Sequence, residues 1–186
     1  MKAREFDPLH LDVEVFAKDG GHLEGAWPLR ALTRLVETAP AEASPAERDG
    51  VAWQARGELR PQRGGAGQIW LHLAANAEVA QQCQRCLMPV TAVLAVERSF
   101  QFVAGEDAAA ELDADSEEDV LALTRSLDLR GLVEDELLLE LPLVPRHDVC
   151  PQPLPIPADD LPEGEPAPNP FAALAVLKKG APGAGN

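Results

Sequence analysis

The sequence predicts an α+β fold, in which an antiparallel β-meander has flanking helices and is followed by a tethered short C-terminal helix. Between residues 51 and 102, apolar side chains alternate with polar ones, as in strands that bury one face. Segments on both sides of this region repeat apolar residues with the period of an amphipathic helix. A proline-rich segment then precedes a short amphipathic stretch near the C-terminus.

The first expected elements are a strand and a helix. Residues 11–17 alternate polar and apolar side chains and predict a short strand. A helix is expected from about Pro28 to Ala39, because proline suits the first helical turn. Its apolar stripe would consist of Leu29, Leu32, Leu35, Val36 and Ala39. Residues 40–50 predict a polar loop.

The alternating region predicts three strands of a meander. They cover residues 51–59, 68–82 and 90–102, and the glycine-rich residues 61–67 predict a hairpin loop. The segment Cys83-Gln-Arg-Cys86 would then occupy the turn between the two longest strands.

After the meander, residues 105–119 are acidic and alanine-rich and predict a mobile loop. A second helix is expected from about residue 129 to 141, with Ser126 or Asp128 as its cap. Its apolar stripe would consist of Leu129, Leu132, Val133, Leu137 and Leu141. The acidic residues in its middle, Glu134, Asp135 and Glu136, are expected on the solvent side.

The pattern predicts one folded domain followed by a tail. Residues 1–150 would form a single α+β domain with the CxxC knuckle, and residues 151–168 a proline-rich acidic linker. Residues 169–179 predict a short amphipathic helix, and residues 180–186 a disordered end. Because an isolated helix of this length is marginal in water, we expect it to dock either on its own sheet or on a partner.

The charge is unevenly distributed. The chain carries 16 Lys and Arg against 31 Asp and Glu, a formal net charge of −15. Residues 1–105 contribute −2 of this charge and residues 106–186 contribute −13. An anionic half repels phosphate backbones and attracts basic partners, which argues against chain-wide binding of nucleic acid. The same charge also serves simply to keep a protein soluble.

The sequence predicts a cytoplasmic location. The N-terminus has no apolar run suited to a signal peptide, and no apolar stretch is long enough to span a membrane. Three cysteines are an odd number, which argues against a secreted disulfide framework.

The cysteines carry the most concentrated chemistry of the chain. Cys83 and Cys86 have the spacing of a zinc knuckle, and His147 and Cys150 offer the second half of a tetrahedral site. The resulting hypothesis is one structural Zn(II) held by all four residues. Two alternatives stay open, namely ordinary reduced thiols and a redox pair formed by Cys83 and Cys86.

Other signs of catalysis are weak. His10, His22 and His72 are isolated from one another, and His72 is expected to be exposed or at an edge. The acidic cluster in the second helix fans out around its axis, so its carboxylates do not converge on one atom. The sequence contains neither a phosphate-binding glycine loop nor a nucleophile elbow. We therefore predict a protein that binds rather than an enzyme.

Three segments together resemble the YceD family of bacterial and plastid proteins. They are Cys83-Gln-Arg-Cys86, the run from Val133 to Pro145 with the following His147-Asp148, and the run from Asn169 to Lys178. The resemblance implies a non-enzymatic ribosome-biogenesis factor that supports synthesis, processing or stability of 23S large-subunit rRNA. The cysteine-rich forms of the family carry additional cysteines after the second helix, whereas here only His147 and Cys150 remain.

The expected partner is a ribosome-assembly factor or a basic ribosomal or RNA-modifying protein, with rRNA contacted only indirectly or weakly. The candidate partner-binding residues are Glu134, Asp135, Glu136, Asn169, Pro170, Phe171, Leu174 and Lys178. The alternative functions are a thiol-dependent redox protein using Cys83 and Cys86 and a direct RNA-binding module.

Overall fold

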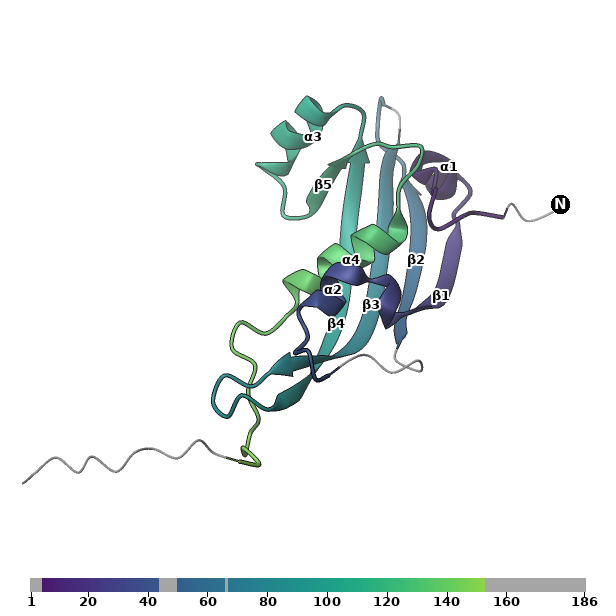
Figure 1. The fold of residues 1–186 in the computed structure, drawn as a ribbon. Helices are drawn as coiled ribbons and strands as arrows, with labels where there is room; N and C mark the ends of the chain where they lie inside the picture. The colour runs from purple at the N-terminus through teal and green to yellow at the C-terminus, as the bar shows by residue number, and fades with distance from the viewer. Residues whose placement is uncertain (1–4, 44–49, 66, 153–186) are drawn as a thin grey trace, which may run out of the picture. The chain divides into compact units, whose positions relative to one another are not determined.

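In the part of the chain that the structure describes, five strands form one sheet in the order β1-β2-β3-β4-β5 (Figure 1). In this computed structural model, residues 5–43, 50–65 and 67–152 are described, and all belong to one unit that spans Met1–Pro153. The strands are β1 (His22–Pro28), β2 (Gly50–Arg60), β3 (Gln68–Gln82), β4 (Pro89–Val103) and β5 (Asp119–Ala122). Each successive pair from β1 to β4 is antiparallel, whereas β5 runs parallel to β4. The predicted α+β fold is confirmed.

Helices pack on this sheet in separate places (Figure 1). The helical elements are α1 (Val13–Lys18), the 3-10 turn η1 (Leu29–Ala31), α2 (Thr33–Glu37), α3 (Glu106–Asp113) and α4 (Leu129–Leu139). Helix α4 crosses one face over β3 and β4 with α2 beside it, whereas α1 packs on β2 and β3. Helix α3 lies against β5 and β4.

The main core lies between the sheet and α1, α2 and α4. In β2 the buried positions are Val51, Trp53, Ala55 and Gly57, every second residue, because side chains alternate between the faces of a strand. The largest fully buried side chains include Phe16, Phe100, Leu11, Leu32, Leu35, Leu71, Leu73, Leu94, Leu129 and Leu137. The predicted meander and hairpin loop are therefore confirmed, with the cysteine pair between β3 and β4.

The strand predicted at residues 11–17 is wrong, because most of this segment forms helix α1. Asp12 caps the helix by accepting a hydrogen bond from the Val15 N–H at 3.1 Å. Val13, Phe16 and Ala17 are buried together on one face of the helix. The alternation in the sequence is real, but the cap and this helical spacing fit the core better.

The helix predicted from Pro28 to Ala39 is much shorter in the structure. Pro28 is the last residue of β1, a strand that the sequence analysis missed, and pairs with Gly50. Leu32 has φ −102° and ψ 80°, which separates the 3-10 turn η1 from α2. The apolar stripe is still buried at Leu29, Leu32 and Leu35.

The loop predicted at residues 105–119 is also wrong. Glu106 and Asp107 lie in the first turn of α3, where carboxylates interact favourably with the helix dipole. Ala109, in the middle of this helix, is buried. The chain then returns to the sheet as β5, so an acidic, alanine-rich composition does not here mean an unstructured segment.

The second predicted helix is confirmed as α4, with Asp128 as its N-cap. The Asp128 carboxylate accepts hydrogen bonds from the Arg130 and Gly131 N–H groups at 3.0 and 3.1 Å. The expected solvent exposure of Glu134 and Glu136 is wrong, because both residues are only 7% exposed.

The proposed linker, the helix at residues 169–179 and the C-terminal tail lie outside the described residues, apart from Pro151 and Gln152. Within the described part of the chain, no helix is long and apolar enough to cross a membrane.

Candidate metal centre

A tight turn between β3 and β4 carries Cys83 and Cys86. The Cys83 N–H donates a hydrogen bond to the Met88 carbonyl at 3.0 Å, and the Leu87 N–H donates to the Cys83 carbonyl at 2.9 Å. Leu87 has a φ of 62°, a left-handed conformation that helps the chain reverse here. This turn brings both cysteines to one tip of the hairpin.

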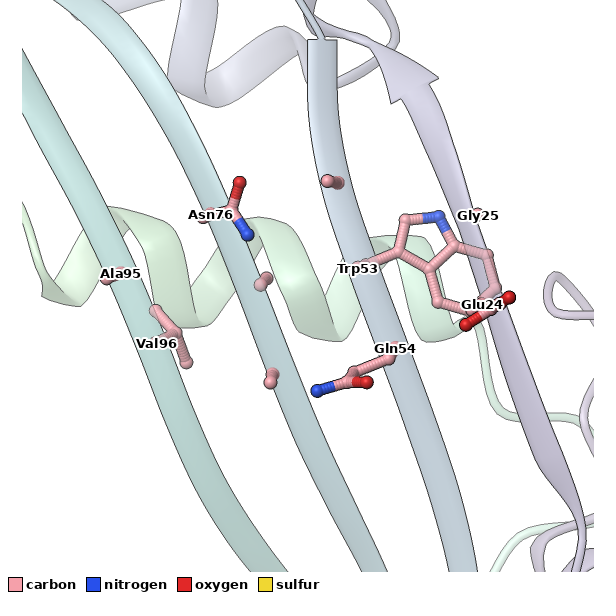
Figure 2. Close-up of a pocket in the computed structure, with 10 residues that line it drawn as sticks. Glu24, Gly25, Trp53, Gln54, Asn76, Ala95 and Val96 are labelled. Atoms are coloured by element: carbon pink, nitrogen blue, oxygen red, sulfur yellow. The ribbon is translucent and has the colours of Figure 1, made fainter.

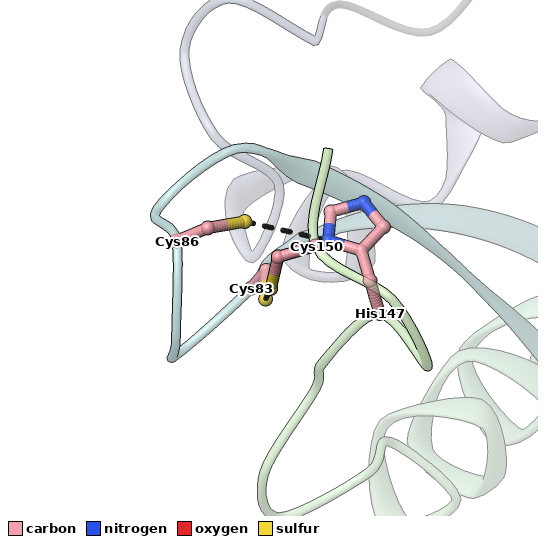
Figure 3. Close-up of side chains that lie close together, drawn as sticks. All are labelled: Cys83, Cys86, His147 and Cys150. Carbon is pink, nitrogen blue, oxygen red and sulfur yellow. Dashed lines mark hydrogen bonds between the residues drawn. The ribbon is translucent and has the colours of Figure 1, made fainter. Parts of the chain in front are cut away.

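The segment after α4 returns to this turn. Pro142 and Pro145 lack the N–H groups that a continuing helix needs, and the chain after α4 has no regular secondary structure. The Gln84 N–H donates to the Pro145 carbonyl at 2.9 Å and ties the segment to the knuckle. His147 and Cys150 consequently lie opposite the two knuckle cysteines (Figure 3).

The four side chains can hold one metal ion. One ligand atom from each of Cys83, Cys86, His147 and Cys150 lies within 4.8 Å of all the others. The Cys83 and Cys150 sulfurs are 3.8 Å apart, and the Cys86 sulfur is 3.4 Å from His147 Nδ1. Zinc–sulfur bonds of about 2.3 Å in a tetrahedron place two sulfurs about 3.8 Å apart. Three thiols and one imidazole are moreover a usual donor set for structural zinc.

The cysteines are buried and not bonded to one another. Cys83, Cys86 and Cys150 are 0%, 4% and 8% exposed, and all three are free thiols. With Val90 they form a small cluster separate from the main core. The 3.8 Å between the Cys83 and Cys150 sulfurs far exceeds the roughly 2 Å of a disulfide bond.

The two knuckle thiols have opposite electrostatic surroundings. Burial acts to raise the pKa of Cys83, but hydrogen bonds from the backbone of His147, Arg85 and Cys86 lower that pKa to about 5. Burial raises the pKa of Cys86, and the neighbouring sulfurs of Cys150 and Cys83 raise it further. A thiolate at Cys83 is therefore favoured at neutral pH, and a thiolate is the form that binds metal.

Two further contacts at the site were missed by the sequence analysis. Arg85 Nε lies 2.9 Å from the Cys150 sulfur, and His147 Nε2 lies 3.0 Å from the Pro89 carbonyl oxygen. A donor N–H at Nε2 leaves Nδ1 free as the ligand atom, on the side that faces Cys86. The sequence signal for the first contact was the arginine between the two cysteines of the CxxC motif. That signal alone could not identify Cys150 as its partner, because the contact depends on the fold.

The acidic residues predicted to bind a partner are occupied within the protein. Glu134 accepts hydrogen bonds from the Arg34 and Leu35 N–H groups at 2.7 and 3.1 Å, and Arg34 also pairs with Asp135. Glu136 pairs with Arg98 of β4 at 3.3 Å. Of the three acidic residues, only Asp135 is exposed, so only its carboxylate is accessible to a partner. The other predicted contacts, Asn169, Pro170, Phe171, Leu174 and Lys178, lie outside the described residues.

His72 belongs to a polar network in the middle of the sheet rather than at an edge. Its Nδ1 lies 2.9 Å from Ser99 Oγ, and its Nε2 lies 2.7 Å from Glu58 Oε2. This order of groups is reminiscent of a serine hydrolase. However, strand N–H groups lie in the plane of the sheet, whereas the Ser99 side chain stands out of it. The strand around Ser99 therefore supplies no oxyanion hole to the hydroxyl.

A shallow hollow of about 670 Å³ lies over β1 to β4 (Figure 2). It is lined by Glu24, Gly25, Ala52, Trp53, Gln54, Ala74, Ala75, Asn76, Ala95 and Val96. Glu24 is the only ionisable side chain among these lining residues, so they contain no acid–base pair and no set of metal ligands.

Comparison with known proteins points to one family. The family model described as "Large ribosomal RNA subunit accumulation protein YceD" matches residues 71–178. A protein of Haemophilus influenzae with the same description is 39% identical over 108 residues, which cover 55% of this chain and 61% of that relative. The match includes the knuckle, α4 and the second pair of candidate ligands. No solved structure matches the chain.

Proposed function

The chain belongs to the YceD family, and we propose that it is a non-enzymatic ribosome-biogenesis factor that supports accumulation of 23S rRNA in the cytoplasm. The observation that carries this proposal is the family match over residues 71–178, which include the knuckle and α4. The aligned part spans about 61% of the relative's length, so the relative's role is transferred here as a hypothesis.

The charge distribution supports a basic protein as the direct partner. Residues 106–186 contribute −13 of the net charge, and such a surface attracts basic proteins and repels the phosphates of naked RNA. Asp135 and the residues from Asn169 to Lys178 remain the candidate contacts. Glu134 and Glu136 would contribute indirectly, by holding α4 in place.

A deletion experiment tests the role in rRNA accumulation. Loss of the gene should lower the ratio of large-subunit to small-subunit rRNA, including their precursors, and the full-length chain supplied in trans should restore it. An unchanged ratio across several growth temperatures would contradict the proposal.

Affinity purification with and without nuclease then distinguishes the two classes of partner, because a protein partner survives nuclease and an RNA-mediated one does not.

We further propose that Cys83, Cys86, His147 and Cys150 hold one structural Zn(II). The ion would cross-link the β3–β4 turn to the segment after α4, and no reaction is assigned to it. Elemental analysis of chain purified without chelator should give close to one zinc per chain. The double variant C83S/C86S should lose the metal, whereas H10Q, which changes an exposed histidine elsewhere, should keep it. A wild-type chain without zinc would overturn this part of the proposal.

A thiol redox role is the alternative, and the lowered pKa of Cys83 favours it. Against it, the CxxC segment lies between two strands rather than at a helix N-terminus, where redox cysteines of this spacing are usually activated. The C150S and H147A variants separate the two functions. A redox pair formed by Cys83 and Cys86 would retain its activity in both variants, whereas a four-ligand metal site would be impaired in both.

A further inference from the structure

Arg85 belongs to the first half of the candidate metal centre, and its side chain contacts the second half. Its Nε lies 2.9 Å from the Cys150 sulfur. Its Nη2 donates to the carbonyls of His147 and Asp148 at 3.0 and 3.1 Å. A single guanidinium, carried by the knuckle itself, therefore holds both the sulfur and the backbone of the segment that supplies the last two ligands.

The geometry suits arginine and not lysine. The planar guanidinium presents several N–H groups in a rigid fork, so it can reach one sulfur and two carbonyls at the same time. A lysine ammonium is a point charge on a flexible stem and cannot reproduce this spacing.

The charge of the loaded site favours the same residue. Three thiolates and a neutral imidazole around Zn²⁺ leave a net charge of −1, which a nearby guanidinium would offset. Because Arg85 is exposed at the surface, water screens this long-range attraction. The direct hydrogen bond to the sulfur therefore contributes more to the interaction than the net charge does. The hydrogen bond from the Arg85 side chain withdraws electron density from the Cys150 thiolate.

We propose that Arg85 is a positioning residue of the metal centre, which fixes Cys150 and the backbone of residues 147–148 in ligand geometry. This inference rests on the zinc site proposed above. On the opposite side, the contact between His147 Nε2 and the Pro89 carbonyl orients the imidazole, so each ligand of the second half has its own outer partner. Arg85 thereby connects ligands that are separated by 60 residues in the sequence.

The test compares zinc affinity among arginine variants of the full chain, measured by competition with a chromogenic chelator. R85M should raise the dissociation constant for zinc about 10- to 100-fold, the usual cost of losing an outer-shell partner. R85K, which keeps the charge without the fork, should resemble R85M more closely than wild type. R146M is the matched control, because it removes an equal charge from an exposed residue beside His147 and should change affinity less than about 3-fold.

A spectroscopic measurement separates positioning of the ligand from general stability. In the Co(II)-loaded chain, loss of the hydrogen bond to Cys150 should move the thiolate-to-cobalt charge-transfer band to longer wavelength in R85M but not in R146M. Wild-type affinity together with an unchanged band in R85M overturns the role of Arg85 and leaves the metal centre intact. If the wild-type chain binds no zinc, the metal centre and the role of Arg85 are both wrong.

Discussion

Gly57 determines how closely α1 can approach the sheet. A Cβ atom at this position would lie 2.7 Å from the Phe16 carbonyl oxygen and 2.8 Å from the Ala17 Cα, both backbone atoms of α1. The Gly57 N–H also donates to the Gly21 carbonyl at 2.9 Å. We expect G57A to lower the free energy of unfolding by about 1–3 kcal/mol, because α1 must move away from β2. Urea unfolding measures the loss.

The control for this prediction is G65A in the β2–β3 loop. A Cβ atom at Gly65 would meet nothing closer than 3.8 Å, so this variant should unfold close to wild type. Equal stability of G57A and wild type would mean that α1 does not pack on β2 as described.

Glu136 makes a contribution to stability that depends on pH. Burial raises the pKa of its carboxyl from the ordinary value of 4.5, although Arg98 partly counteracts the rise. A pKa raised in the folded state means that the folded protein binds the proton more tightly than the unfolded chain. The stability gained from that proton is complete below pH 4.5 and is lost as the pH rises through the folded-state pKa.

We therefore predict that wild type loses stability relative to E136Q between pH 4 and pH 7. Urea unfolding at several pH values measures the difference between the two proteins. E140Q, at an exposed position directly after the same helix, is the matched control. A difference that is constant or of opposite slope would mean that burial does not control this carboxyl.

At the level of elements, helix α2 depends on a cap supplied from another helix. Its N-cap residue, Leu32, offers no side-chain hydrogen bond. Glu134 of α4 takes that role by accepting the N–H groups of Arg34 and Leu35, and its carboxylate also pairs with the Arg34 side chain. Glu134, which lies in the segment that matches the YceD family, thus holds α2 and α4 together.

The prediction is that E134A lowers the free energy of unfolding by about 1.5–3 kcal/mol, because it leaves two N–H groups of α2 without their acceptor. E134Q should lose less, since the amide oxygen can still accept one of these hydrogen bonds. E140A serves as the control on the exposed side. If E134A matches E140A in chemical denaturation, the inter-helix cap does not contribute to stability.

These elements also show what could be predicted from the sequence. Strands β2, β3 and β4 were predictable because their alternation is long and their hairpins carry glycine or the cysteine turn. Helix α1 was not, since six residues fit both periods and packing decides between them. The role of Glu134 could not be predicted either, because its partner Arg34 lies 100 residues away and is brought near only by the fold.

The candidate site was more predictable than the elements around it. Thiols and imidazoles that can share a metal are few in this chain, so their types and spacing already selected Cys83, Cys86, His147 and Cys150. Arg85 was not predicted, because arginine is common and its hydrogen bonds to the second half-site depend on how that segment returns after α4.

At the scale of the whole molecule, the residues that the structure describes form two unequal hydrophobic clusters. The main one joins the sheet to α1, α2 and α4, whereas the other consists of Cys83, Cys86 and Cys150 with Val90. The main core contains no cysteine, so its apolar burial does not depend on a metal. Any zinc that the site binds should therefore stabilise the knuckle end locally rather than the fold as a whole.

We predict that a strong chelator leaves the sheet folded and loosens only the knuckle end. Amide hydrogen exchange of the zinc-loaded chain should accelerate about 10-fold or more in residues 83–90 and 142–152 after chelation, because those segments lose a shared cross-link. Exchange in the central parts of β2, β3 and α4 should change little, and unfolding should stay cooperative. The C83S/C86S variant should show the fast pattern with or without chelator, which controls for effects of the chelator itself. Global loss of protection on zinc removal would mean that the main core cannot fold alone, and the metal would then be a condition of folding and not a local cross-link.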